Sequence, residues 1–182
     1  MIYVFLADGF ETIEALTVVD ILRRGKVDIQ TVSITEEKMV RSAQNIYVQA
    51  DITISEMNPE AQMYVLPGGI PGTPNLNNHA KVMECIKTQY EKGGYIAAIC
   101  AAPSIFAKLG YLKDKEAICY PDYEQMLAEN GAIVVKKGAV KEDNVITGRA
   151  MGTAIDFALT ILEVLAGKET ADRVADAIVY SR

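Results

Sequence analysis

The chain has 182 residues, half of them hydrophobic, and a formal net charge of -6. This length suits one α/β domain with a sizeable core. An acidic chain without a cluster of lysines and arginines repels phosphate groups and anionic headgroups, which argues against a nucleic-acid partner and against a membrane surface.

The first residues, MIYVFLADGFE, predict a buried strand and not a signal peptide. They lack a basic n-region, and their apolar run ends at Asp8. Nowhere does an apolar run reach the roughly 18 residues that a membrane span needs. We therefore expect no membrane partner.

Apolar strand-like runs alternate with helical patterns along the rest of the chain. In chain order, the sequence predicts a strand at 2–7, a helix at 11–24, a strand at 28–34, a hairpin or extended arm with a connecting piece at 39–54, a strand at 62–69, a helix at 77–92, a strand at 95–100, a helix at 102–109, a strand at 116–120, a helix at 123–131, a hairpin within 132–148, and helices at 151–166 and 169–179. In the first helix, Ile13, Leu16, Val19 and Leu22 are spaced as an apolar face, and Gly25 is placed to cap its C-terminus.

Strands that alternate with helices are typical of βαβ units. The fold class that we predict is α/β, with a flavodoxin-like, doubly wound and mostly parallel sheet sandwiched by helices, in one domain over residues 1–182. Ligand sites in such sheets lie outside the carboxyl ends of the strands. That rule directs attention to residues 7–14, 67–72 and 100–103.

Cys100 lies where an apolar strand meets a helix in the stretch YIAAICAAPSIFAKLG. A residue at such a sharp turn can present its side chain above the sheet, provided that its neighbours are small, as Ala98 and Ala102 are. Free N–H groups at the following helix start favour the thiolate. The alternative is a buried cysteine that fills space, and the two interpretations are about equally supported.

Two further segments lie after predicted strands. The glycines of LPGGIPG, residues 66–72, can present backbone N–H groups to an oxyanion, although a simple tight turn explains them equally well. In DGFETIE, Glu11 and Glu14 lie three residues apart at a helix start, where acidic residues also complement the helix dipole. Beside a thiolate in a pocket that contains little water, a carboxyl group would be pushed toward its protonated form. It could then donate a hydrogen bond to the sulfur and stabilise the anion.

The remaining cysteines and the one histidine give little support to other chemistry. Cys85 fits a helix core position and Cys119 a strand position, while His79 begins a polar helix. No CxxC occurs, so we expect no metal site, and no phosphate-binding loop is present, so we expect no cofactor. Unpaired thiols favour a reducing compartment, and we expect a cytoplasmic location.

Four segments together resemble the ThiJ/PfpI superfamily, and within it the branch of the parkinsonism-associated deglycase and its bacterial relatives. They are ADGFETIEALTVVDILRRG, YVLPGGIPGTPNL, IAAICAAPSIFAKLG and TGRAMGTAIDFALTILEVLAGKE, which keep the order and spacing of that family nearly end to end. The resemblance implies a flavodoxin-like sandwich, a homodimer and a reactive cysteine at the turn.

The resemblance also implies roles for individual residues. Cys100 matches the nucleophilic, oxidation-sensitive cysteine, and Glu14 matches the glutamate that hydrogen-bonds it, with Glu11 as its neighbour. Gly69 and Ala101 match residues whose backbone N–H groups face the sulfur or a substrate oxygen. Arg24 and Arg149 match arginines near the dimer contact of relatives.

Two positions depart from the family pattern. Ala101 follows the cysteine, where the protease-like branch has histidine. Tyr120 precedes Pro121, where the deglycase branch usually has histidine; a tyrosine can donate a hydrogen bond but is a poor proton shuttle at neutral pH. Both departures weigh against peptidase activity and favour weak or absent glyoxalase or deglycase activity.

We therefore predict a cysteine-dependent, cofactor-independent enzyme that acts on small reactive carbonyls such as methylglyoxal, or on glycated adducts. Cys100 would add to the aldehyde, and Glu14 would move the proton during rearrangement. One alternative is a redox sensor or oxidation-responsive chaperone without significant turnover, based on oxidation of the same thiol. A further alternative is a small amidase or intracellular peptidase.

Overall fold

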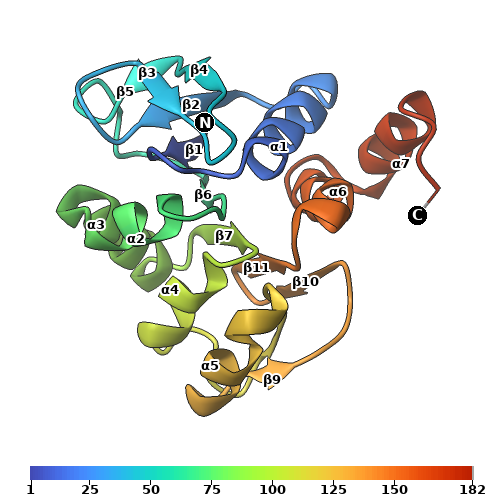
Figure 1. The fold of residues 1–182 in the computed structure, drawn as a ribbon. Helices are drawn as coiled ribbons and strands as arrows, with labels where there is room; N and C mark the ends of the chain where they lie inside the picture. Colours follow the sequence, from blue (N-terminus) through green and yellow to red (C-terminus); the bar gives the residue numbers. More distant parts are fainter. Residues whose placement is uncertain (182) are drawn as a thin grey trace.

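A seven-stranded sheet forms the centre of the protein in the computed structural model, which describes residues 1–181 (Figure 1). Its strands follow the order β10-β11-β7-β6-β1-β2-β5. They are β1 (Ile2–Leu6), β2 (Ile29–Ser33), β5 (Ile52–Thr53), β6 (Met63–Leu66), β7 (Tyr95–Ile99), β10 (Ala139–Glu142) and β11 (Val145–Gly148). All neighbouring strands are parallel except β10, which runs antiparallel to β11. Without the two-residue edge strand β5, the parallel strands follow the order β2-β1-β6-β7-β11. Numbered along the chain, this is the 2-1-3-4-5 order of flavodoxin-like sheets.

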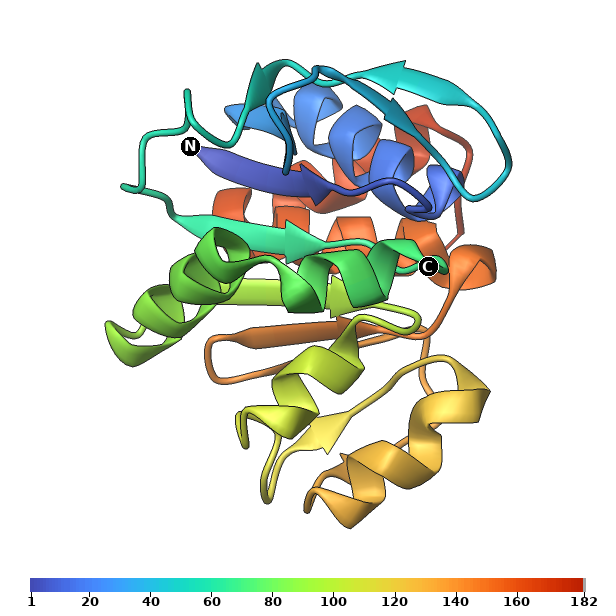
Figure 2. The same cartoon turned by 60° about the vertical axis from the view of Figure 1, so that its left-hand side comes forward.

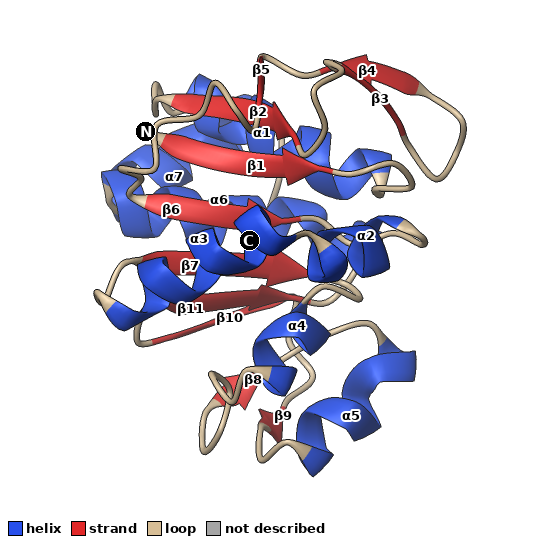
Figure 3. Ribbon diagram, turned by 90° about the vertical axis from the view of Figure 1, so that its left-hand side faces the viewer, coloured by secondary structure: helices blue, strands red, loops and turns tan. Residues whose placement is uncertain are grey.

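Helices cover both faces of this sheet (Figure 3). One face carries α1 (Thr12–Arg24), α6 (Ala154–Ala166) and α7 (Lys168–Ala177), and the other carries α2 (Gly72–Asn78), α3 (Ala80–Glu91) and α4 (Pro103–Lys108). Outside the sheet, α5 (Glu124–Glu129) packs against α4. The hairpin of β3 (Met39–Arg41) and β4 (Tyr47–Gln49) and the parallel pair of β8 (Glu116–Ala117) and β9 (Ile133–Val134) complete the fold, with short 3-10 turns at Pro121–Tyr123 and Met151–Thr153.

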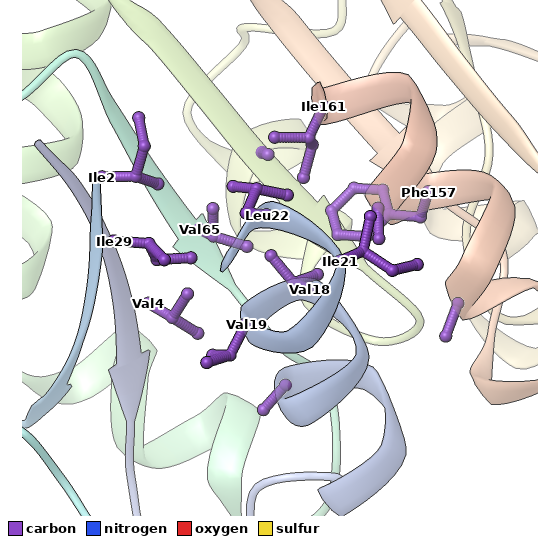
Figure 4. Close-up of a cluster of buried hydrophobic side chains, with 14 of the residues drawn as sticks. Ile2, Val4, Val18, Val19, Ile21, Leu22, Ile29, Val65, Phe157 and Ile161 are labelled. Carbon is purple, nitrogen blue, oxygen red and sulfur yellow. The ribbon is translucent and has the colours of Figure 1, made fainter. Parts of the chain in front are cut away.

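Alternation along the central strands produces two cores, one for each face. In β1, Ile2, Val4 and Leu6 point toward α1 and α6, whereas Tyr3 and Phe5 point toward α3. Figure 4 shows the first of these cores, where side chains of α1 and α6 meet those of the strands. A strand that is buried on both faces reads as a continuous apolar run, which is why these segments were recognisable in the sequence.

The predicted fold class is confirmed by this mostly parallel, helix-sandwiched sheet, and the predicted hairpin arm at 39–54 is confirmed by β3 and β4. Gly25 follows α1 as predicted and donates its N–H to the carbonyl of Ile21 at 3.0 Å. A side chain there would also collide with α6, because its Cβ would lie 2.4 Å from Cδ1 of Leu162.

The predicted apolar face of the first helix is confirmed at Val19 and Leu22, which are buried, but not at Ile13, which is 48% exposed, or at Leu16, which is half-buried. Ala15 and Val18, which the prediction left out, are fully buried against the sheet and α6. The period was right, but a 3.6-residue repeat admits two neighbouring faces when apolar residues lie on both. The structure leaves Ile13 at the surface, at the same end of α1 as Glu14.

Three other boundaries differ from the prediction. The single helix expected at 77–92 is divided by His79, which ends α2 in an extended conformation (ψ 110°) and caps α3 by accepting the N–H of Val82. We missed α2 because Gly72 and the asparagines of its sequence are poor helix formers. The strand expected at 116–120 ends at Ala117, so Cys119 lies in a buried loop, and residues 133–134 pair with that strand and not with the 139–148 hairpin.

The parallel strands all end at one edge of the sheet, so the loops that follow β1, β6 and β7 gather there (Figure 2). These loops carry the three segments that the strand-end rule selected. Within residues 1–181, none of the helices combines the length and the apolar composition that crossing a membrane requires.

Candidate active site

Cys100 occupies the turn between β7 and α4 in a left-handed backbone conformation, with φ at +66°. Its N–H donates to the carbonyl of Gly148 at 3.0 Å, and its own carbonyl accepts the N–H of Tyr120 at 2.8 Å. These bonds to two other segments hold a backbone angle that is uncommon for residues other than glycine. All three cysteines are free, but only Cys100 is partly exposed. The geometry is that of a side chain presented above the sheet.

Glu14 lies beside this thiol in the first turn of α1 and is only 1% exposed. Its Oε2 accepts the N–H of Gly68 at 2.9 Å, while its Oε1 is buried without a hydrogen-bond partner among the described residues. Buried carboxyl oxygens are normally partnered, so an unpartnered one is available to a proton or a ligand.

Gly68 is the residue that allows Glu14 and Cys100 to approach each other. A Cβ at this position would lie 2.6 Å from Cβ of Cys100, 2.7 Å from Oε2 of Glu14 and 3.1 Å from the sulfur. No side chain fits there without moving one of the two groups. Glycine at this position is therefore a requirement of the site. The glycines of LPGGIPG do more than form a simple tight turn, which was the alternative that the sequence left open.

The backbone N–H groups of Gly69 and Ala101 face the sulfur and favour its anionic form. Gly69 has φ at +96°, and its Cβ would lie 2.4 Å from the carbonyl oxygen of Gly9, so glycine is again required. The structure thus brings both of the predicted backbone donors to the thiol. Two such donors could also steady an oxyanion that forms next to the sulfur.

Burial sets the ionisation of the pair. It raises the pKa of Glu14 to about 7, with a smaller contribution from the charge of Glu11, while hydrogen bonds from Cys100 and Gly68 oppose the rise. Burial and, to a smaller extent, the Glu14 carboxylate raise the pKa of the Cys100 thiol, and the backbone N–H groups of Ala101 and Gly69 lower it. The net result is a pKa of about 12. The N–H groups at the helix start favour the thiolate as expected, but desolvation and the neighbouring carboxylate outweigh them. The pair instead consists of a protonated thiol and a carboxyl group that exchanges its proton near neutral pH.

Cys100 opens into a pocket of about 410 Å³. Its lining residues are Glu11, Glu14, Ala43, Gln44, Gly69, Ile70, Cys100, Tyr120, Ala150 and Met151. Ile70 and Met151 follow β6 and β11 at the carboxyl edge, so the strand-end rule could have found them. Ala43 and Gln44 come from the β3–β4 hairpin, which reaches the site because the N–H of Ala43 donates to the carbonyl of Phe10 at 2.9 Å. Nothing in the sequence signals that contact.

The other predicted site residues are divided between the pocket and the rest of the surface. Glu11 and Tyr120 line the pocket. Arg24 lies in the last turn of α1, at the opposite end from Glu14, and pairs with Asp20 at 2.7 Å. Arg149 follows β11 near the site but outside its lining, and its Nη2 lies 3.8 Å from Oε1 of Glu124. The structure thus assembles Cys100, Glu14 and their neighbours but does not bring Arg24 to them.

Histidine and metal chemistry receive no support from this pocket. His79 caps α3 and lines a separate hollow with Asp8 and Asn75. Residues 1–181 contain no group of three or more His, Cys, Asp or Glu side chains that could hold a metal ion. What the pocket offers is a thiol, a proton-exchanging carboxyl group and two backbone donors, an arrangement suited to nucleophilic addition at a carbonyl carbon.

The chain is similar to known proteins over nearly its whole length. The model of the DJ-1/PfpI family matches residues 1–164. Protein DJ-1alpha of Drosophila melanogaster is 36% identical over 180 residues, which cover 98% of this chain and 83% of that protein. A Caenorhabditis elegans protein named glutathione-independent glyoxalase DJR-1.2 is 31% identical over 173 residues, covering 94% of this chain and 91% of that one.

Solved structures show the same fold over the whole chain. The crystal structure of Drosophila melanogaster DJ-1beta has a TM-score of 0.94 at 34% identity and covers 100% of this chain and 98% of its own. The structure described as Toxoplasma gondii DJ-1, oxidized, has a TM-score of 0.93 at 30% identity, with the same coverage.

Replacing Glu14 by glutamine is expected to lower the pKa of the Cys100 thiol. The substitution removes a negative charge next to the sulfur, and a like charge at this range raises a pKa by about one pH unit or more. The measurement is the pH dependence of Cys100 alkylation by iodoacetamide, followed by peptide mass spectrometry. Cys85, which is buried elsewhere, provides the internal control. A midpoint that is unchanged or higher in Glu14→Gln would contradict this account of the pair.

Glu14 is also expected to make stability depend on pH. Its pKa is raised from about 4.5 to about 7 by folding, so its contribution is fully present below the lower value and is lost as the pH rises through the higher one. Between pH 5 and pH 8 the wild type should lose about 2 kcal/mol relative to Glu14→Gln. Urea unfolding of both proteins at the two pH values measures this. A difference that does not change with pH would show that Glu14 is ionised throughout.

Proposed function

The chain belongs to the DJ-1/PfpI family, and from that premise we propose that it is a cofactor-independent enzyme in which Cys100 adds to small reactive carbonyls such as methylglyoxal, or to glycated adducts. The observation that carries the proposal is the partly exposed thiol against a buried carboxyl group with an unpartnered oxygen. The name of the Caenorhabditis elegans relative, a glutathione-independent glyoxalase, supports the same chemistry at 31% identity.

In the first step, the sulfur of Cys100 attacks the aldehyde carbon of the substrate. The thiol proton passes to the Glu14 carboxylate as the C–S bond forms, because the thiol is protonated at rest. The electron pair of the C=O bond moves to oxygen, where the N–H groups of Gly69 and Ala101 stabilise it. Glu14 then passes the proton to this oxygen, which yields a hemithioacetal bound to the enzyme and leaves Glu14 as a carboxylate.

In the second step, the hemithioacetal rearranges. Glu14 removes the proton from the former aldehyde carbon and returns it to the adjacent carbonyl carbon, so that one carbon is oxidised as the other is reduced. The resulting thioester reacts with water, which releases a hydroxy acid and restores the thiol. A carboxyl group with a pKa near 7 suits both directions of proton transfer at neutral pH. Tyr120, on the pocket wall, contributes a hydrogen-bond donor and no proton shuttle.

We also propose that the protein forms a homodimer. Apolar side chains that are about half exposed or more surround the site, namely Ile13, Ile46, Tyr47, Ile70 and Met151. An exposed apolar patch of this kind marks an interaction surface, and a second copy of the chain is the partner that the family resemblance implies. The cytoplasmic location stays a prediction. It is consistent with three free cysteines, because thiols stay reduced in that compartment.

Oxidation sensing is the second candidate function, and the amides of Gly69 and Ala101 are the observation that favours it. Donors that face the sulfur would stabilise a sulfinate as well as an oxyanion. A protonated Glu14 would donate a further hydrogen bond to that group. In this role the thiol is the target of peroxide and no carbonyl is turned over.

Cys100→Ser is expected to lower kcat/KM for methylglyoxal by about 100-fold or more, because it removes the nucleophile. The assay follows formation of the hydroxy acid by purified protein. Cys85→Ala, which alters a buried thiol outside the pocket, should retain wild-type turnover. Equal activity of Cys100→Ser and wild type would exclude the mechanism.

Mild peroxide is expected to add two oxygen atoms to Cys100 and to leave Cys85 and Cys119 unmodified, because only Cys100 is partly exposed. Mass spectrometry of the digested protein measures this for the wild type and for Glu14→Ala. Loss of the sulfinate in the variant supports sensing through Glu14, whereas equal oxidation of all three cysteines argues against it.

A further inference from the structure

We propose that the carboxylate of Glu11 makes the pocket selective for uncharged and cationic reactive carbonyls and excludes those that carry a carboxylate or a phosphate. The inference rests on the proposed addition at Cys100 and names the substrate class of that site. Its starting point is the composition of the pocket wall, which within the described chain contains two glutamates and no lysine or arginine.

Glu11 is the permanent charge of the two. Its Oε1 accepts the N–H of Ile13 at 3.1 Å, and its own N–H donates to the carbonyl of Gly68 at 2.9 Å, so both ends of the residue are held at the mouth of the pocket. Glu14, in contrast, exchanges its proton during the reaction and is neutral for part of the cycle. The charge of Glu11 also reaches into the pocket, since it raises the pKa of Glu14.

Among the described residues of the protomer, no lysine or arginine lines the pocket to neutralise this charge. The N-terminus of α1 offsets about half an elementary charge. Arg149 lies outside the lining, with its guanidinium toward Glu124, and the backbone of Arg41 contacts Asp8 and Gly9 from the hairpin without bringing its side chain into the lining. The chain as a whole carries a net charge of -6. A permanent anion on the substrate therefore meets repulsion at the mouth.

The reacting centre has the opposite polarity. The N–H groups of Gly69 and Ala101 face the sulfur and favour negative charge there. An oxyanion that develops during the reaction is thus stabilised, while an anion that the substrate already carries is repelled a few ångströms away. This division separates uncharged α-oxoaldehydes from acidic ones that have the same reactive group.

The size of the effect follows from Coulomb's law. Two unit charges about 8 Å apart at an effective dielectric constant of about 40 change a rate ratio about fivefold. Because Glu11 is partly exposed, salt should screen the effect, and raising the ionic strength from about 0.05 M to 0.5 M should reduce it.

Alkylation of Cys100 tests the inference without requiring turnover. Iodoacetamide is uncharged and iodoacetate is anionic, and both react with the same thiolate, so the ratio of their rate constants is independent of the thiol pKa. Division by the ratio for 2-mercaptoethanol removes the intrinsic difference between the reagents. Wild type should favour iodoacetamide, and Glu11→Gln should reduce that preference about fivefold.

Glu11→Gln is a suitable variant because glutamine retains an oxygen that can accept the N–H of Ile13. The matched control is Glu60→Gln, which removes the same charge from the loop before β6, at the opposite edge of the sheet, and should leave the ratio unchanged. An equal ratio in wild type and Glu11→Gln, or an equal shift in both variants, would overturn the inference.

Turnover then separates this inference from the proposed function. The substrates are 4,5-dioxopentanoate, its methyl ester and its choline ester, which share one α-oxoaldehyde group and differ in charge. Wild type should turn over the two esters in preference to the acid, and Glu11→Gln should narrow that difference. A shifted alkylation ratio with no turnover of any substrate would retain the charge selectivity and reject the enzymatic function.

Discussion

The site depends on one contact, in which the buried carboxyl group of Glu14 meets the N–H of Gly68 and the thiol of Cys100. Burying a carboxyl group costs free energy unless its oxygens are hydrogen-bonded, and only one of these two oxygens is. The protein retains this cost at the edge of its sheet, where the carboxyl group contacts the thiol of Cys100. An uncompensated buried carboxyl group at this edge of the sheet supports the functional role that we propose for Glu14, because an apolar side chain would serve a purely structural role as well.

The sheet order makes this contact possible. β6 lies between β1 and β7, so the segments that follow these three adjacent strands, and that carry Glu14, Gly68 and Cys100, leave the sheet at the same edge. Those residues are more than 30 positions apart in the chain. The alternation of strands and helices predicts this topology, and the rule that ligands lie beyond the carboxyl ends of parallel strands selects the same three loops. The fold class and the central residues of the site were therefore within reach of the sequence.

Other features depend on tertiary contacts that no local pattern encodes. The exposure of Ile13 follows from which of two apolar stripes α1 turns toward α6. Gln44 enters the pocket because the β3–β4 hairpin bonds to the loop after β1. The sequence indicates the helix-start N–H groups that favour the Cys100 thiolate, but not the net ionisation of the thiol, because the desolvation of the sulfur and the charge of Glu14 appear only once the chain is folded.

A protonated resting thiol has a consequence for selectivity. Addition to a carbonyl and oxidation by peroxide both need the thiolate, and in the mechanism that we propose the proton leaves the sulfur by way of Glu14. The thiol therefore reacts only with molecules that reach the pocket while the carboxylate is available. A permanently ionised cysteine would react with any electrophile that encounters it. Coupling the two groups restricts the reactivity of Cys100 to ligands that fit the pocket and tolerate its charge, which is the property that a nucleophile facing solvent needs.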